Sequence, residues 1–515
     1  MTQPLLPTVP SAAATAALAL LLSGCAATGN FDMPRAGTPP TDPANGMPAT
    51  HDARANPAAA PESATAQVAL SNPAGGAAGQ ATLRELPGRS GVEIAIEVQG
   101  MAPGRHGFHI HAHGACAPGP DAATGQIVPF GAAGGHFDPF MTRNHGRPGQ
   151  SANDAHAGEL PNIEVGADGS GRLRYTNPHV TLQPGETSVL GRTLVVHERA
   201  DDYASDPAGD SGGRIACGLI EPAGPSMVTG RAVFEGANVF PEGIAIDPAS
   251  GVAYVGSSTE GHIYRLAPGA AQAELFQSGG SPGRQAAYGM EIDRQGRLWV
   301  AGGPTDTVAL VDLKTAATVQ VVEGPKDGHA FLNDLAMAGP FLYVTDSFRP
   351  VLWRIDTRQG PSARLEPWLD LRTTPVRYKP NEINWNGIVA SPDGRWLLAV
   401  QQSTGELWRI HTETRAVTPV RLEGGDLQHG DGLLLVGATD LYVVRNAAHE
   451  LVRVTLATGW DSGRVVQRLH DPRLKYPTTA ALAGSAMWVV NGQTDKQKAP
   501  PPLLPFDVLR IGLPR

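Results

Sequence analysis

The chain has 515 residues, of which 41% are hydrophobic and 17% charged, and its formal net charge is −9 at pH 7. A chain of this length is expected to hold more than one domain. It carries no basic patch, no aromatic stacking platform and no nucleic-acid-binding motif, so nucleic acid is excluded as a partner.

The first 25 residues contain a short apolar stretch, Ala12 to Leu22, followed by Ser23-Gly24-Cys25. The stretch is too short to span a bilayer, so a cleaved signal is expected. The pattern resembles a bacterial lipoprotein signal, which implies that Cys25 is lipidated and begins the mature chain. No Lys or Arg precedes the stretch, and a plain secretory peptide is the alternative. We therefore expect a protein outside the cytoplasm, periplasmic or held at the outer membrane by a lipid anchor only.

Two changes of composition follow the predicted signal. Residues 26–63 are rich in Ala, Pro, Gly and Thr, which predicts a disordered linker. From residue 64 onward, apolar or alternating segments such as 67–70, 92–98 and 172–175 lie between Gly, Asn and Pro turns. This pattern predicts an all-β domain, an antiparallel barrel or sandwich.

The segment Gly107-Phe108-His109-Ile110-His111 is the first of a series of metal-binding residue types. Histidines two apart on a strand project from one face, so His109 and His111 can share a metal while Phe108 and Ile110 face the core. A lone His-x-His would be a weak signal. The series continues, however, with 135–139, 144–146, 154–159, 194–198, 201–202 and 213–218.

Taken together, these motifs resemble the copper/zinc superoxide dismutase family in its bacterial form, over residues 64–222. The resemblance implies a Greek-key β-barrel that converts superoxide to oxygen and hydrogen peroxide. It also implies the ligand sets, with His136 shared: copper at His109, His111, His136 and His197, and zinc at His136, His145, His156 and Glu159. The family has aspartate where this chain has Glu159, so a solvated loop carboxylate with a weaker zinc site is the alternative for that residue.

The resemblance also assigns roles around the metals. Asp201 would bridge a copper histidine and a zinc histidine and orient both rings. His136 would take up a proton and return it to the peroxide, and Arg214 would draw the anion toward copper with its permanently charged fork. The alternative for Arg214 is a surface salt bridge. Cys116 and Cys217 would form the family's disulfide, a bridge that persists in oxidising compartments.

About 300 residues remain after Pro222, and they are repetitive. Six segments resemble one another and are expected to end an outer strand: 262–266, 308–312, 352–356, 407–411, 451–454 and 508–511. Hairpins such as 293–300 and 391–397 recur between them. Turn-bounded strands with a period of about 45 to 50 residues predict a propeller, here a six-bladed one over residues 223–515.

The start of each inner strand carries a short motif, and four of these motifs place an oxygen-bearing side chain there: Glu242, Asn333, Asn386 and Asp431. They resemble the gluconolactonase and senescence-marker-like family, which implies a calcium ion that polarises a lactone carbonyl. Asn-Gly and Asp-Gly are also ordinary turn dipeptides. A propeller that only binds a small ligand is the alternative.

Two interpretations of the whole chain follow. In the first, the chain is an exported superoxide dismutase, an antioxidant oxidoreductase with an accessory propeller. In the second, the front domain is a copper-binding, metal-buffering module and the propeller is the lactonase-like or ligand-binding part. Arg214, Asp201 and the shared His136 favour the first, because a copper store needs ligands but no anion-steering arginine. The propeller's substrate and the oligomeric state cannot be read from these residues.

Overall fold

The structure is a computed structural model that describes residues 64–121, 124–183, 185–224, 226–280, 284–498 and 502–513. The predicted signal peptide, Cys25 and the predicted linker lie outside the described residues. Strands dominate the described part, and its helical segments are short 3-10 turns: η1 Pro87–Arg89, η2 Gly131–Ala133, η3 Thr357–Ser362, η4 Leu371–Thr373 and η5 Thr494–Lys496. Within these ranges no helix is both long and apolar enough to cross a membrane.

The strands between Thr65 and Pro222 form a nearly closed barrel. Their order is β4-β8-β9-β3-β2-β1-β11-β10-β5, with β12 paired to β1 and a separate pair formed by β6 and β7. Their bounds are β1 Thr65–Ser71, β2 Ala77–Glu85, β3 Val92–Val98, β4 Gly104–His106, β5 Phe108–His111, β6 Gly119–Pro120, β7 Ile127–Val128, β8 Ile163–Val165, β9 Gly171–Asn177, β10 Thr193–His197, β11 Arg214–Leu219 and β12 Glu221–Pro222. The pairings of β3 with β9 and β1 with β11 skip along the chain, as in a Greek key.

The barrel closes because β4 and β5 stand at opposite ends of the strand order, yet only Gly107 separates them in the chain. Side chains of β3 alternate between buried and more exposed positions, which is the period-2 pattern expected of a strand with one face on a core. Ile94 and Ile96 contribute to that core, as do Phe108 and Ile110 of β5. The predicted all-β class and the predicted strands at 67–70, 92–98 and 172–175 are confirmed.

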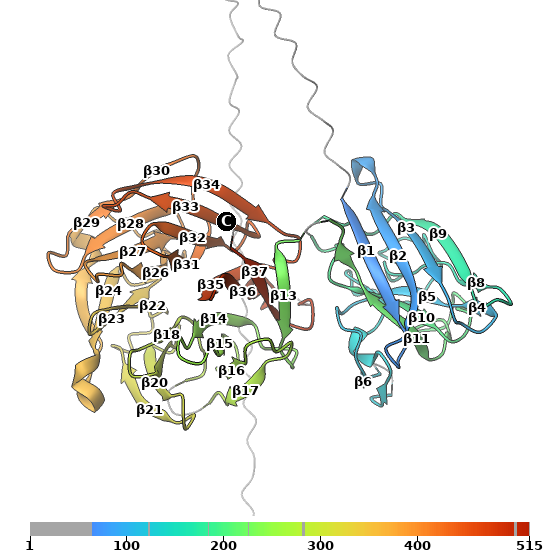
Figure 1. Ribbon diagram of the computed structural model, residues 1–515, viewed down its shortest axis with the longest axis horizontal. Helices are drawn as coiled ribbons and strands as arrows, with labels where there is room; N and C mark the ends of the chain where they lie inside the picture. The colour runs from blue at the N-terminus through green and yellow to red at the C-terminus, as the bar shows by residue number, and fades with distance from the viewer. Residues whose placement is uncertain are drawn as a thin grey trace, which may run out of the picture. The chain divides into compact units, whose positions relative to one another are not determined.

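The second part is a six-bladed propeller, seen in Figure 1 as sheets arranged in a ring. Its blades are β14 Pro241–Ile246, β15 Ala253–Ser257, β16 Ile263–Leu266 and β17 Glu274–Gln277; β18 Met290–Ile292, β19 Arg297–Ala301, β20 Thr307–Asp312 and β21 Thr318–Glu323; β22 Leu332–Ala338, β23 Phe341–Asp346, β24 Val351–Asp356 and β25 Glu366–Asp370; β26 Trp385–Ala390, β27 Trp396–Gln401, β28 Glu406–His411 and β29 Val417–Pro419; β31 Gly430–Val436, β32 Asp440–Arg445, β33 Glu450–Leu456 and β34 Ser462–His470, with β30 Arg421–Glu423 on its edge; and β35 Pro477–Ala483, β36 Ala486–Asn491, β37 Asp507–Gly512 and β13 Val228–Val233.

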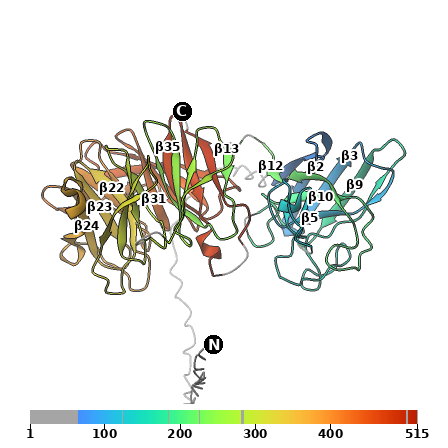
Figure 2. The same ribbon diagram turned by 90° about the horizontal axis from the view of Figure 1, so that it is seen from below.

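Strand β13 closes the ring, because the first strand of the propeller pairs with its last, β37, in one antiparallel sheet. Figure 2 turns the blades on their side, where β22, β23 and β24 lie next to one another. The inner strands β14, β18, β22, β26, β31 and β35 each contact the next around the ring. This arrangement brings the starts of all inner strands to one mouth of the channel.

One detail of the predicted repeat is wrong. The repeated segments were expected to end an outer strand, but each is the third strand of its blade, as β16 lies between β15 and β17. The outermost strands have no common motif, because they are the most exposed and few core contacts restrict their side chains. The hairpins predicted at 293–300 and 391–397 do form, as β18–β19 and β26–β27.

Candidate metal centre

Strand β5 supplies the first two imidazoles. All of its residues are buried. His109 and His111 leave the same face, while Phe108 and Ile110 point into the barrel core. Strand β10 pairs with β5 so that Val195 lies opposite His109, and β10 ends at His197. Two neighbouring strands thereby present three histidines on one side of the sheet.

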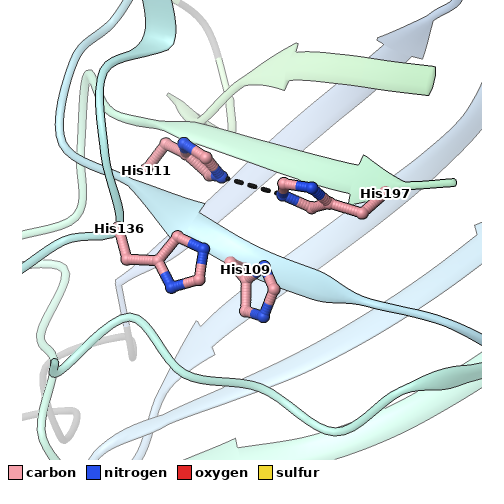
Figure 3. Close-up of side chains that lie close together, drawn as sticks. All are labelled: His109, His111, His136 and His197. Atoms are coloured by element: carbon pink, nitrogen blue, oxygen red, sulfur yellow. Dashed lines mark hydrogen bonds between the residues drawn. The ribbon is translucent and has the colours of Figure 1, made fainter. Parts of the chain in front are cut away.

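Four imidazoles meet in one cluster, formed by His109, His111, His136 and His197 (Figure 3). One nitrogen from each lies within 4.8 Å of the others. His111 donates from Nδ1 to the carbonyl of Gly134 at 2.8 Å, and His197 does so to Gly212 at 3.3 Å. In the neutral ring the opposite nitrogens are then acceptors.

Those two acceptor nitrogens, Nε2 of His111 and Nε2 of His197, lie 3.2 Å apart. Nδ1 of His109 and Nε2 of His136 are buried and have no hydrogen-bond partner among the described residues. Lone pairs that converge in this way favour a cation between them. Neutral imidazole nitrogens are ligands that copper prefers, so this cluster fits copper.

A second cluster lies on the other side of His136. The Nδ1 atoms of His136, His145 and His156 lie 3.0, 2.9 and 2.8 Å from Oε1 of Glu159. The Glu159 side chain is 2% exposed. Three imidazole nitrogens and one carboxylate oxygen are a ligand set that zinc takes, and Glu159 supplies the oxygen here.

Asp201 ties the two clusters together. Its Oδ2 accepts from Nε2 of His109 at 2.7 Å, and its Oδ1 accepts from Nε2 of His145 at 2.8 Å. Because the Nε2 proton of His109 is held by Asp201, Nδ1 of that ring is left as the acceptor toward the four-histidine cluster. This is the bridging position that the family resemblance implied for Asp201.

Burial and charge determine the protonation of these side chains. Burial, with the neighbouring His109, lowers the pKa of His136 to about 3. Burial likewise lowers the pKa of His111 and of His197 well below the usual range, so these rings stay neutral, the form that binds metals. Burial alone would raise the pKa of Glu159, but the adjacent His136 and hydrogen bonds from three imidazoles hold it well below its usual range.

His145 differs, because both of its nitrogens face carboxylates. Burial opposes protonation, yet hydrogen bonds to Asp201 and Glu159 raise the pKa of His145 to about 10. The metal-free ring is therefore a cation, and zinc binding would displace the proton on Nδ1.

The loop that carries His145 and His156 is held against β5. The backbone N–H of Ile110 donates to the carbonyl of Gly158 at 2.9 Å. A Cβ added at Gly158 would lie 2.4 Å from the Ile110 carbonyl oxygen, so only glycine permits this approach. The N–H of His145 donates to Oδ1 of Asp206 at 2.6 Å, which fixes the backbone of the loop from a second side.

Arg214 starts β11 beside the four-histidine cluster, paired in register with His197. Its guanidinium donates to the carbonyls of Phe130 and Gly134, both at 2.7 Å. Gly134 also accepts from His111, so one carbonyl holds both a histidine of the cluster and the arginine. The side chain is half-buried, and no salt bridge of Arg214 is present in the described part of the chain.

The cysteines lie where the resemblance implied a bridge. Cys116 and Cys217 form a disulfide whose Cα atoms are 5.6 Å apart. Cys217 is three residues after Arg214 on β11. The bridge thereby ties this strand to the 116–134 segment, which supplies the carbonyls that Arg214 contacts.

Two supporting residues were missed by the sequence analysis. Asn162 holds the backbone of Asp201 from both sides, accepting from its N–H at 2.8 Å and donating to its carbonyl at 2.9 Å. Gly209 has φ +63°, and a Cβ there would lie 1.8 Å from Oδ1 of Asp201. Neither residue belongs to a short motif, so only the folded chain reveals them.

The mouth of the propeller also gathers its predicted residues. Glu242, Asn333, Asn386 and Asp431 line one cavity of about 20 Å³, enough for a single water-sized ligand. Glu242 is 7% exposed, and its carboxylate has no hydrogen bond or ion pair within the described ranges. Burial, with Asp431 nearby, raises the pKa of Glu242 well above its usual range.

Hydrogen bonds orient the other three side chains of this cavity. The amide Nδ2 of Asn333 donates to Oγ of Ser347, and that of Asn386 donates to Oε1 of Gln402, both at 2.9 Å. With its Nδ2 engaged, each amide keeps its oxygen for a cation. Nδ2 of Asn446 likewise donates to Oδ2 of Asp431 at 2.9 Å, which leaves Oδ1 of Asp431 for the cavity.

A further carboxylate, Asp334, lines the cavity and was not predicted as a metal ligand. Its Oδ2 accepts from the N–H of Ile388 at 3.0 Å, so it joins two neighbouring inner strands. Burial raises the pKa of Asp334 to about 6 and that of Asp431 to about 7. Carboxylates so close together favour either protons or a divalent cation.

The barrel is similar in sequence to proteins of known family. A sequence-family model described as copper/zinc superoxide dismutase (SODC) matches residues 77–220. Superoxide dismutase [Cu-Zn] of Deinococcus radiodurans is 46% identical over 157 residues, which cover 30% of this chain and 84% of that protein. The corresponding protein of Brucella abortus is 38% identical over 145 residues, 28% of this chain and 78% of that protein.

A solved structure, Cu/Zn superoxide dismutase from Brucella abortus, aligns with 35% identity and a TM-score of 0.27, covering 30% of this chain and 99% of that chain. The family assignment rests on the sequence matches and on the geometry of the two histidine clusters. Through its N-terminal barrel, the chain belongs to the copper/zinc superoxide dismutase family.

Proposed function

We propose that the chain is a superoxide dismutase that holds copper at His109, His111, His136 and His197 and zinc at His136, His145, His156 and Glu159. One observation carries the proposal, namely the converging acceptor nitrogens of the four-histidine cluster. Their two closest members, on His111 and His197, are 3.2 Å apart with no donor between them.

Bound copper would supply the one-electron chemistry that oxidises one superoxide to oxygen and reduces a second to hydrogen peroxide, with two protons consumed. The protein positions the proton. His136 is placed to hold it at Nε2, because this atom has no partner while Nδ1 is fixed by Glu159. The return of that proton to the reduced product is the role that His136 has in this proposal.

Arg214 attracts the substrate. Its fork is held by the carbonyls of Phe130 and Gly134, so the charge does not move when an anion approaches. A permanently charged guanidinium beside the cluster raises the local concentration of a small anion although the whole chain is acidic. Because the side chain is half-buried, one face stays open to solvent.

The test is the rate of superoxide decay after Arg214→Ala, measured by stopped flow on protein with known copper and zinc content. We expect kcat/KM to fall about tenfold or more. Arg199→Ala is the matched control, since Arg199 is an exposed arginine paired with Asp210 on the adjoining loop. Unchanged decay with copper bound would favour the copper-storage interpretation instead.

We also propose that the propeller mouth binds calcium through Glu242, Asn333, Asn386 and Asp431. The support is the unpartnered Glu242 carboxylate and the orientation of both amides by Ser347 and Gln402. Calcium prefers such a set of carboxylate and amide oxygens. Bound calcium would supply a positive charge able to polarise the carbonyl of a lactone, and hydrolysis of a lactone is the activity we assign to this site.

Elemental analysis of the purified full chain tests this assignment. We expect about one copper, one zinc and one calcium per chain, and loss of calcium alone in Glu242→Gln. Calcium-dependent hydrolysis of a lactone, followed by alkali uptake at constant pH, tests the activity. Copper and zinc without calcium would contradict the assignment and leave the propeller a ligand-binding domain.

We infer that the chain is exported and lipid-anchored at Cys25. The apolar stretch before Cys25 and the disulfide, which suits an oxidising compartment, support this. Mass spectrometry of the N-terminal peptide should find an acylated cysteine. A soluble protein whose mature chain begins elsewhere would overturn the inference.

A further inference from the structure

Three aromatic rings lie in a row at the propeller mouth: Tyr288, Phe331 and Phe348, here called the aromatic arm. The ring centroids of Tyr288 and Phe331 are 4.9 Å apart at 68°, and those of Phe331 and Phe348 are 5.5 Å apart at 73°. Tyr288 and Phe331 are half-buried, while Phe348 is 43% exposed. The arm therefore packs edge to face and still presents apolar surface to solvent.

The chain connects each ring to the candidate calcium cavity. Tyr288 precedes Gly289, whose N–H donates to the carbonyl of Asn333 at 2.8 Å. Phe331 lies two residues before Asn333, immediately ahead of β22. Phe348 follows Ser347, the residue that orients the Asn333 amide. Each ring therefore belongs to a residue close in the chain to one that lines the cavity or orients a side chain of it.

The backbone of Tyr288 packs against Gly243, a residue that lines the cavity. A Cβ added at Gly243, the neighbour of Glu242, would lie 2.0 Å from the Tyr288 carbonyl oxygen, so the two segments are in contact. Burial and the charge of Glu242 raise the pKa of the Tyr288 hydroxyl above its usual range, which keeps it protonated. Its hydroxyl has no hydrogen-bond partner in the described part of the chain.

The arm is built rigidly. Oδ1 of Asp346, a fully buried residue, accepts from the N–H of Phe331 at 3.1 Å and from that of Phe348 at 3.2 Å. The N–H of Ser347 donates to the carbonyl of Phe331 at 2.9 Å. At the Tyr288 end of the arm, Gly303 has φ +56°, and a Cβ there would lie 2.4 Å from the Tyr288 ring. An exposed aromatic residue fixed in this way loses little conformational entropy when a ligand binds.

The cavity itself is too small for an organic molecule, since its volume is about 20 Å³. A ligand whose oxygen reaches the cation must therefore lie outside the cavity, against the wall of the mouth. We propose that the aromatic arm binds the ring or alkyl part of such a ligand, so that the propeller selects lactones with an apolar substituent over polyhydroxylated ones. This inference rests on the calcium site and lactone chemistry proposed above.

The experiment measures binding of coumarin, an aromatic lactone, to the calcium-loaded full chain by equilibrium dialysis. A polyhydroxylated γ-lactone, galactono-γ-lactone, serves as competitor. We expect coumarin to bind, the sugar lactone to compete only at concentrations at least tenfold higher, and Phe348→Ala to weaken coumarin binding about tenfold. Phe348→Tyr should restore it. Leu482→Ala is the control, since Leu482 is 38% exposed near the end of β35, away from the mouth.

The outcomes separate this inference from the function on which it rests. Coumarin binding that is lost in Phe348→Ala but unchanged in Glu242→Gln would support the arm and contradict the calcium site. Equal affinity in the wild type and Phe348→Ala, tighter binding of the sugar lactone, or no binding of coumarin would each overturn the arm. Calcium binding by the same samples, measured separately, would still decide the cation site.

Discussion

Removal of the Cys116–Cys217 disulfide should lower both the stability of the barrel and its dismutase rate. The bridge joins residues 101 apart in the chain. A loop of this size gives a chain-entropy contribution of about 4.7 kcal/mol to the free energy of unfolding at 25 °C. With a urea dependence of about 2 kcal/mol/M, the unfolding midpoint of the barrel should fall by about 2 M.

Removal of the disulfide should also make the Arg214 guanidinium less firmly positioned. Cys217 packs with Phe130 and Ala133, and Phe130 supplies a carbonyl to the guanidinium. Without the bridge, Phe130 and Ala133 lose their covalent link to β11 and keep these contacts and backbone hydrogen bonds such as that from the N–H of His113 to the carbonyl of Ala133 at 2.9 Å. We expect the rate of superoxide decay in Cys116→Ser/Cys217→Ser to fall toward that of Arg214→Ala, even where the barrel is still folded and its copper is bound.

The tryptophans provide an internal control for this experiment. All eight lie at Trp299 or later, within the propeller. Unfolding of the metal-free chain in urea should be followed by tryptophan emission for the propeller and by far-ultraviolet circular dichroism for the whole. In the double serine variant, the urea midpoint of the barrel transition, which is seen by circular dichroism but not by tryptophan emission, should fall. The midpoint of the propeller transition, which is seen by both, should stay the same. A barrel transition at the same urea concentration as in the wild type would refute the reasoning, as would a shift of the tryptophan transition by the same amount.

Further predictions concern the other supports of the metal sites. Gly209→Ala should displace Asp201 and weaken zinc binding about tenfold to a hundredfold in competition with a chelator, whereas Gly125→Ala, with open space at its Cβ, should not. Glu159→Gln should lower zinc content and retain copper in elemental analysis, because it removes the anion shared by three imidazoles. The raised pKa of Asp431, about 7, means that its stabilising neutral form is lost as pH rises through 7. The tryptophan unfolding midpoint without calcium should therefore fall between about pH 4 and 7. Asp431→Asn should reduce that fall but not abolish it, because burial also raises the pKa values of Glu242 and Asp334.

Much of the barrel site could be predicted because its chemistry is local in sequence. The alternation of Phe108, His109, Ile110 and His111 dictates which side chains share a face, since strand side chains alternate strictly. The propeller was predictable for a related reason. Each blade repeats the same alternation of core-facing residues and turns, so the period is visible in one sequence.

The motifs at the starts of the inner strands also predicted which propeller residues lie together. The oxygen-bearing residues at the starts of the inner strands do line one cavity. Their hydrogen-bond partners Ser347, Gln402 and Asn446 were not predicted, because they lie at the ends of the second strands. Their relation to the inner strands exists only once each hairpin pairs.

The sequence by itself determined the strand pattern, the number of blades and the residue types able to bind metals, because these depend on spacing along the chain. Only the tertiary structure decided which nitrogen of each histidine faces which cluster, how Asp201 and Asn162 support them, and that Tyr288, Phe331 and Phe348 form one surface. Those relations join residues far apart in the chain. They depend on strand register and on close approaches at Gly158 and Gly209, which the packed fold establishes and no local spacing encodes.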